Sequence, residues 1–306
     1  MSMQLWVTDS LGGYTNLPAL SAQLRHAAQP LTKFRQFCDI KESYGKGRDS
    51  NFNFDKVSNV QTEGGTLTET ATMPRTNLII YQGTGTLNEY GNALGYTQKL
   101  EQFAKFDIKN PLQRALRDDM AKVIDKAVEA QFDAAKIRAV YSADTATMEW
   151  TTNGTATVTA TCNLDDWAVK EIVDYMEGTM LAPKYDGENY MAICTVKALR
   201  GLHDHLQAIW MYTKYPVNGE VGQYYGCRFT KETNAMDGTI GNSNVGGEAY
   251  FFGADTVIEA VSLPEEIRYE TKDFGRDKGI AWYGVLGFQI MWAGDPDNRI
   301  VKFTSA

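Results

Sequence analysis

The chain has 306 residues, of which 43% are hydrophobic and 22% are charged, and its formal net charge is −8. This composition is typical of a globular protein with a sizeable core, and it excludes disordered and fibrous chains. No stretch reaches the roughly 18 apolar residues of a membrane span. Met1–Trp6 also has no basic patch before an apolar run, so we expect a soluble, unsecreted protein with no membrane partner.

The charge is unevenly distributed along the chain. Residues 1–141 carry 17 Lys/Arg against 15 Asp/Glu, whereas residues 142–306 carry 13 against 23. Neither half has the basic stripe with interleaved aromatic residues that is typical of a nucleic-acid-binding protein. The cysteines lie far apart without a CxxC pair, which favours free thiols in a reducing compartment over disulfides or a zinc knuckle. They are Cys38, Cys162, Cys194 and Cys227.

The first hundred residues have little capacity to fold on their own. Residues 1–50 are interrupted by glycine and proline, as in Tyr44–Arg48, and are predicted to form an extended arm. Two strand-like segments follow at 51–60 and 76–90, with the polar stretch Gln61–Thr66 after the first. The pattern predicts a long two-stranded hairpin, which is marginal alone in water and needs a neighbouring surface.

The strongest local signal is a long helix. We predict Asn110 as its N-cap, Pro111 at its first position and Gln113 three residues after the cap. A helix from Pro111 to Ile137 would be about 40 Å long. The alanines of its apolar stripe favour packing on a sheet over a coiled coil. The stripe comprises Leu112, Leu116, Met120, Val123, Ala127, Ala130, Ala134 and Ile137. The other face carries charges of both signs: Arg114, Arg117, Asp118, Lys122, Asp125, Lys126, Glu129 and Asp133.

Residues 142–260 are predicted to form a separate α/β region. A helix capped by Asp165, a buried strand at Tyr190–Cys194 and a second helix capped by Thr195 are expected there. The final stretch, 263–306, is interpreted as strands that return to the domain of the long helix. Further strands are predicted at Thr155–Thr161, Tyr224–Thr230, Ala249–Phe252, Ile267–Tyr269, 280–292 and Ile300–Phe303.

Residues that could carry chemistry are few. His203 and His205 lie two positions apart on a predicted helix and point about 200° apart, so they cannot chelate one metal together. Asp295–Arg299 lacks the ligand spacing of a calcium loop, and Gly83–Thr86 has no lysine for a phosphate loop. We therefore expect no catalytic, metal-binding or cofactor-binding residues and no enzymatic activity.

Other charged and aromatic clusters have structural explanations. Asp165–Asp166 fits a helix start, and Glu265–Glu266 fits a solvated turn. Four aromatic residues could stack on bases or sugars, but their strand spacing is more typical of a core. They are Trp282, Tyr283, Phe288 and Trp292.

The order of arm, hairpin, long helix, inserted α/β domain and returning strands resembles a known fold over nearly the whole chain. That fold is the Hong Kong 97-type fold of tailed-phage major capsid proteins. Three stretches, in the right order, are similar to the coat-protein branch of short-tailed phages. They are Leu87–Thr97, Gly222–Phe229 with Thr233–Asn234, and Gly247–Asp255.

The resemblance implies an α+β fold with named parts. Residues 1–50 would be the N-terminal arm and 51–100 the extended loop. Residues 101–141 with 261–306 would form the peripheral domain around a spine helix, and 142–260 the axial domain. The implied function is a major capsid protein whose hexamers and pentamers enclose phage DNA. An encapsulin-like nanocompartment shell and a small-molecule enzyme or binding module are the alternatives.

The resemblance also implies the partners and the location. The chain would bind copies of itself, portal and scaffolding proteins and, as a further candidate, a decoration protein. It would act in the virion after assembly in the host bacterial cytoplasm, without a cofactor. Packaged duplex DNA would be touched weakly and without sequence preference, because only scattered basic residues of the arm are available. These are Arg25, Lys33, Arg35, Lys46 and Arg48.

Overall fold

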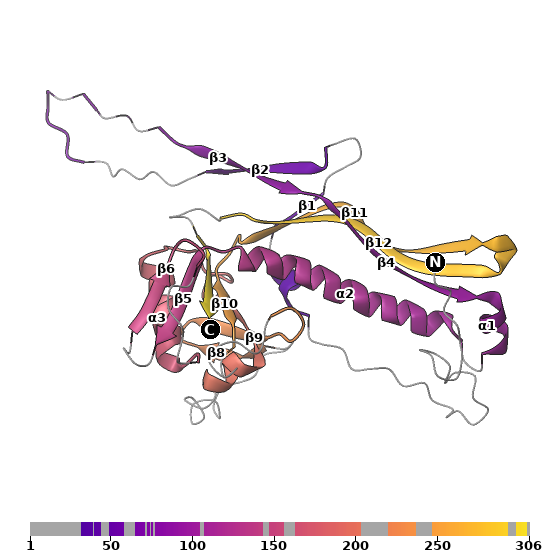
Figure 1. Ribbon diagram of the computed structural model, residues 1–306. Coiled ribbons are helices and arrows are strands. Elements are labelled where there is room, and N and C mark those ends of the chain that lie inside the picture. The colour runs from indigo at the N-terminus through magenta and orange to yellow at the C-terminus, as the bar shows by residue number, and fades with distance from the viewer. Residues whose placement is uncertain are drawn as a thin grey trace.

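The protein is an elongated body with a compact α/β unit at one end, a long helix beside a narrow sheet, and a projecting hairpin (Figure 1). This α+β architecture agrees with the predicted class. The computed structural model describes residues 32–38, 40–43, 49–57, 65–70, 72–73, 75, 77–104, 107–142, 147–155, 163–202, 220–236, 247–292 and 298–304.

The compact unit is built on a seven-stranded mixed sheet with the order β6-β5-β13-β10-β7-β9-β8. Helix α3, Asp166–Gly178, packs on it through Ala168, Ile172 and Met176. Its predicted cap is confirmed, since Asp165 Oδ1 accepts a hydrogen bond from the N–H of Ala168 at 2.7 Å. The strands are β5 Ile137–Ser142, β6 Thr147–Thr151, β7 Tyr190–Cys194, β8 Glu220–Tyr224, β9 Cys227–Lys231, β10 Ala249–Phe252 and β13 Ile300–Thr304.

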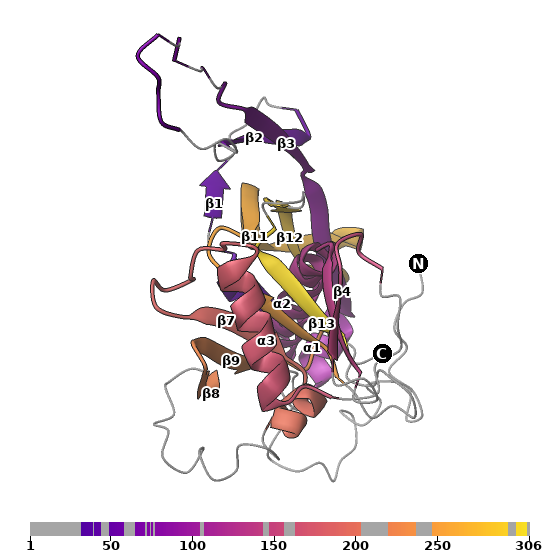
Figure 2. The same cartoon turned by 90° about the vertical axis from the view of Figure 1, so that its left-hand side faces the viewer.

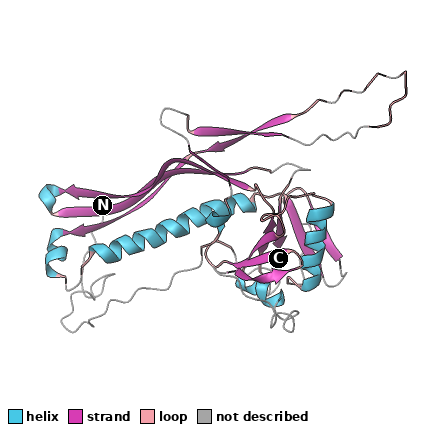
Figure 3. Cartoon of the chain, turned by 180° about the vertical axis from the view of Figure 1, so that it is seen from behind, coloured by secondary structure: helices cyan, strands magenta, loops and turns pink. Residues whose placement is uncertain are grey.

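The narrow sheet has four strands in the order β1-β11-β12-β4. Figure 3 shows α2 running along it, with one end of the helix at the compact unit. Leu116 of α2 packs there against Tyr96, Ile280 and Trp282. The short helices α1, Gln98–Phe103, and η4, Asp273–Gly275, lie at its far end. The strands are β1 Ile40–Ser43, β4 Asn88–Thr97, β11 Val257–Lys272 and β12 Asp277–Ile290.

The long helix is confirmed, but its ends differ from the prediction. Helix α2 spans Lys109–Asp133, and Asn110 lies inside its first turn instead of capping it. Asp107 takes the capping role: its Oδ1 accepts from the N–H of Lys109 at 3.1 Å and its Oδ2 from Nδ2 of Asn110 at 2.7 Å. An upstream carboxylate competes well for first-turn N–H groups. At the other end, Ile137 begins strand β5.

The buried face of α2 also differs from the predicted stripe in its second half. Leu116 is buried as expected, but the ridge continues through Ile124, Val128 and Phe132 instead of the alanines. Residues spaced by four drift by about 40° per step around a helix. The ridge therefore turns from the narrow sheet towards the 3₁₀ turn η2, Phe34–Phe37, where Phe132 meets Phe34 at 5.4 Å between ring centroids.

The predicted hairpin is confirmed, and it depends on the narrow sheet. Strands β2, Asn51–Val57, and β3, Ile80–Thr86, pair antiparallel and stand clear of the compact unit (Figure 2). Phe52 and Phe54 anchor them by packing on Ile258 of β11. The predicted strand 76–90 is divided at Leu87, because β4 then pairs with β12.

Two further strand predictions were wrong in detail. Ile300–Phe303 was placed with the long helix, but β13 pairs with β5 and β10 in the centre of the wider sheet. All five of its residues are buried, and a short, largely apolar run of this kind does not reveal which strands it pairs with. Tyr224–Thr230 contains a turn at Tyr225-Gly226, where both residues have positive φ, and so forms the β8–β9 hairpin.

Several predictions fall outside the described residues. They concern the strand Thr155–Thr161 beyond Thr155, the histidines, Cys162, the loop before Asn298 and most of the arm.

Candidate assembly surfaces

The last part of the arm is held against α2 by a buried carboxylate. Asp125 Oδ1 accepts from the backbone N–H of Phe34 at 2.8 Å, and its Oδ2 accepts from Nδ2 of Asn234 at 3.3 Å. Burial raises the pKa of Asp125, although the N–H groups around it favour its ionised form. Helical spacing predicted that Asp125 lies on a solvent-exposed face. That pattern carries no information about a partner 91 residues away in the sequence.

An ion-pair cluster holds the same segment to β11. Arg35 donates from Nε and Nη2 to Oε1 of Glu259, at 3.0 and 2.7 Å, and also pairs with Glu265 at 2.5 Å. Lys41 reaches the other oxygen of Glu259 at 3.2 Å. Glu265 is therefore part of a strand and an ion pair, and its interpretation as a solvated turn was wrong. Arg35, proposed as a DNA contact, is engaged within the subunit.

The hairpin presents apolar side chains to solvent. Val57, Leu78, Ile79, Ile80 and Tyr81 are all exposed, Ile80 by 62%. Contiguous exposed apolar residues at the end of a two-stranded element are typical of a surface that a partner covers. Nearer the body the outer face is polar, with hydrogen bonds such as Thr84 to Asn53 at 3.0 Å.

The glycines of Gly83–Thr86 serve the hairpin and do not form a phosphate loop. A Cβ at Gly83 would collide with the ring of Phe54, and one at Gly85 with the ring of Phe52. Both rings lie across the partner strand, so only glycine lets them reach the core.

A second exposed surface lies at the far end of the narrow sheet. Phe274 in the β11–β12 turn is fully exposed, with φ of 53°, an uncommon conformation for a bulky residue. Tyr269 and Phe103 are also exposed there, and the N–H of Gln98 donates to the carbonyl of Arg276 at 2.9 Å, joining α1 to the turn. Exposed apolar groups therefore occur at both ends of the subunit.

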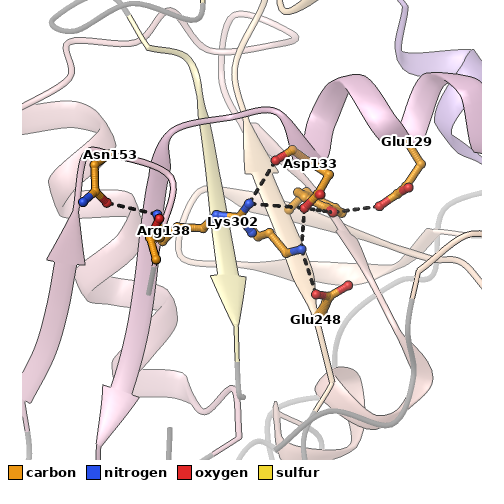
Figure 4. Close-up of polar contacts among 8 residues, drawn as sticks. Glu129, Asp133, Arg138, Asn153, Glu248 and Lys302 are labelled. Atoms are coloured by element: carbon orange, nitrogen blue, oxygen red, sulfur yellow. Dashed lines mark hydrogen bonds and ion pairs between the residues drawn. The ribbon is translucent and has the colours of Figure 1, made fainter. Parts of the chain in front are cut away.

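Between these ends, a polar network fixes α2 to the wider sheet (Figure 4). Lys302 Nζ lies 2.6 Å from Asp133 Oδ1 and 2.8 Å from Glu248 Oε1. Tyr250 donates its hydroxyl to Glu129 at 2.8 Å. Burial raises the pKa of Glu129, whereas at Asp133 the nearby Lys302 and Arg138 outweigh burial and lower the pKa.

The residues considered for chemistry take structural positions where the structure describes them. Among the described residues, no group of three or more His, Cys, Asp or Glu side chains could hold a metal. Asp165–Asp166 starts α3, Trp282 and Phe288 are core residues, and no described helix is long and apolar enough to span a membrane. The cysteines within the described ranges, Cys38, Cys194 and Cys227, are free and buried.

An elongated subunit with a projecting hairpin, exposed apolar ends and the last part of its arm held against α2 is typical of a component of a larger assembly. The model of the phage capsid protein family matches residues 82–300, which is most of the chain. The chain therefore belongs to the phage capsid protein family, a family of structural proteins of the virion. It is a major capsid protein, which forms a shell with copies of itself.

Solved capsid structures share the fold. The capsid of Ralstonia phage GP4 superposes with a TM-score of 0.68 at 13% identity, covering 94% of each chain. The capsid of cyanophage Pam1 gives 0.64 at 14% identity over 97% of this chain and 99% of that one. The capsid of a native GTA particle gives 0.63 at 16% identity over 99% of both. No curated protein sequence matches. The fold is thus the Hong Kong 97-type capsid fold, and the nanocompartment alternative is not favoured.

Proposed function

We propose that this subunit assembles into hexamers and pentamers of an icosahedral shell that encloses packaged phage duplex DNA, and that it catalyses no reaction. The observation that carries this proposal is the apolar strip Leu78–Tyr81, exposed on a hairpin with one anchored end. An exposed apolar strip does not stabilise an isolated subunit, whereas a neighbouring subunit can bury it.

The parts of the subunit fit this arrangement with adjusted boundaries. The β2–β3 hairpin would be the extended loop, and α2 with the narrow sheet the peripheral domain. The compact unit would be the axial domain at capsomer centres. Its sheet includes β5 and β13, so we propose that it takes in residues 137–142 and 298–304 besides most of 142–260.

Further partners follow from this role. We expect a portal and a scaffolding protein to contact the subunit, a decoration protein to be a further candidate, and assembly to take place in the host bacterial cytoplasm. Nothing in the proposal requires a cofactor or a membrane.

Electron microscopy and light scattering of the purified full chain test the proposal. We expect capsomers, shells or tubes from the unmodified protein. The double variant Leu78→Ser and Ile80→Ser should keep its circular dichroism spectrum but remain as small species, because the lost side chains are exposed in the subunit. Gln82→Ser, on the same hairpin, should assemble normally. A clean monomer of the unmodified protein at every salt concentration would contradict the capsid role.

A further inference from the structure

The outward side of α2 carries a ridge of charged residues. Arg114, Asp118, Lys122 and Lys126 follow one another at spacings of four. They lie opposite the buried ridge of Leu116, Ile124, Val128 and Phe132, since residues two positions apart point about 200° apart. Both ridges drift around the helix together, so the charged ridge keeps facing outward along its whole length.

Basic residues dominate this surface. Arg114 and Lys126 are exposed and Lys122 is half-buried, and Arg117, also exposed, lies beside the ridge. Asp118 is the one acid on it. The neighbouring Asp119 faces inward, where its Oδ2 accepts from Nε1 of Trp282 at 3.0 Å. The four basic residues outweigh the acid, although the protein as a whole has a net charge of −8.

These cations differ from most other cations in the described part of the chain, because they form no ion pair with any described residue. On the other face of the narrow sheet, Arg268 pairs with Glu266 at 2.6 Å and Lys272 pairs with Glu270 at 2.8 Å. Two sides of the same body therefore differ in electrostatic character: one has neutralised pairs, and α2 has uncompensated positive charge.

The remaining exposed positions from Arg114 to Ala130 are small. Ala115, Ala121 and Ala130 are exposed, and no large apolar side chain of this fully described helix is exposed. Protein interfaces are usually centred on aromatic or aliphatic anchors, which are missing here. Binding to the phosphate backbone of DNA requires only positively charged side chains and a close approach, and small neighbouring side chains permit that approach.

We propose that the outward face of α2, centred on Arg114, Arg117, Lys122 and Lys126, is the surface through which the subunit touches the phosphates of packaged duplex DNA. From Arg114 to Lys126 the line is about 18 Å long, shorter than one turn of duplex DNA of about 34 Å. One subunit therefore contacts only a few phosphates. This places the DNA contact on the helix and not on the arm, where sequence analysis put it, and makes the side of the sheet that bears α2 the inner side of the shell.

This inference rests on the proposed function, and one titration tests it. The full-length protein, carrying Leu78→Ser and Ile80→Ser so that it stays unassembled, is titrated into a fluorescein-labelled duplex of mixed sequence, with anisotropy read at several salt concentrations. The variant Arg114→Gln, Arg117→Gln, Lys122→Gln and Lys126→Gln should bind at least about tenfold more weakly at low salt. Its slope of log K against log salt should shrink by about 2 to 3, because each lost phosphate contact removes about 0.9.

A matched control separates this surface from net charge. The variant Lys99→Gln, Arg268→Gln, Lys272→Gln and Arg276→Gln removes as many charges from elsewhere and should change affinity by less than about twofold. Equal losses in both variants, or no loss in the α2 variant, would overturn the proposal. Tighter binding of a labelled polyglutamate peptide than of the duplex would also overturn it, because the surface would then serve an acidic protein.

Electron microscopy of the α2 and control variants made without the two hairpin substitutions keeps the two proposals distinct. The α2 variant should still form particles, because its substitutions leave the hairpin and both sheets intact. If the unmodified protein formed no particles, the shell role would fail while the DNA titration remained interpretable. If particles formed but the α2 substitutions did not weaken DNA binding, only the inference about α2 would fail.

Discussion

At the scale of single residues, the most informative one is Asp125, whose carboxylate takes part in a contact between three segments distant in sequence. It accepts hydrogen bonds from Phe34 and Asn234, and its only described partners are N–H groups. The second buried acid nearby, Glu232, caps its own turn by accepting from the N–H of Ala235 at 2.9 Å and of Met236 at 3.2 Å. The arm, α2 and the 232–236 turn thus meet around two carboxylates.

We predict that Asp125→Ala destabilises the subunit by about 1–3 kcal/mol, because the N–H of Phe34 loses its acceptor in a buried place. Urea unfolding followed by circular dichroism measures this loss, and limited proteolysis should show earlier cleavage near Arg35. Asp118→Ala on the same helix is the control and should change stability by less than about 0.5 kcal/mol. Equal effects of the two variants would mean that Asp125 is not an anchor.

At the scale of elements, the hairpin depends on a fit between two rings and three glycines. Phe52, exposed by 1%, lies where a Cβ on Gly85 or on Gly287 would have to be. The anchor therefore ties β2 and β3 to each other and to β12 at one point, and leaves the far end of the hairpin exposed.

Gly85→Ala should loosen the hairpin without unfolding the subunit, because the new methyl group displaces the ring of Phe52 from its site. Hydrogen exchange should accelerate at least about tenfold in 51–57 and 80–86, while α2 keeps its protection. Gly95→Ala is the matched control, since its nearest neighbour would be a carbonyl oxygen at 3.8 Å. Unchanged exchange in the Gly85 variant would show that the ring can move aside at no cost.

Local rules predicted the elements better than their partners. The α3 cap at Asp165, the hairpin and the length of α2 follow from turn chemistry and periodicity, which act over a few residues. Strand β13 pairs with β5, more than a hundred residues earlier in the chain, and Asp125 contacts Phe34, 91 residues away. No local sequence pattern encodes contacts over such separations. The apolar strip Leu78–Tyr81 was predicted as a strand, but only the structure shows that nothing in the described part of the subunit covers it.

At the scale of the whole molecule, buried acids shape the response to pH. Burial raises the pKa of Asp125, Glu129 and Glu232. A carboxyl with a raised folded-state pKa binds its proton more readily in the folded state, so stability rises as pH falls through that pKa. Asp186 behaves oppositely: burial opposes ionisation, but N–H groups of Asn189 and the guanidinium of Arg228 outweigh it and lower the pKa to about 2. Its contribution is lost only as pH falls from about 3.8 towards 2.

We therefore predict that the free energy of unfolding increases as pH falls from 7 through the raised pKa of these carboxyls, and decreases in stronger acid. Urea titrations of the unassembled Leu78→Ser and Ile80→Ser variant measure this without interference from particles. Adding Glu129→Gln should reduce the increase, because that position no longer titrates. Adding Glu266→Gln at an exposed position should leave it unchanged. A stability that falls steadily from pH 7 would refute the assignment.

The central position of β13 has a consequence for the timing of synthesis. Strands β5 and β6 leave the ribosome early, and β7 to β10 follow, but the two groups are joined only when β13 pairs with β5 on one side and β10 on the other. Lys302 of this strand also ties the end of α2 to the wider sheet. A nascent chain whose residues 300–304 are still inside the ribosome therefore lacks the strand that joins the two halves of its wider sheet.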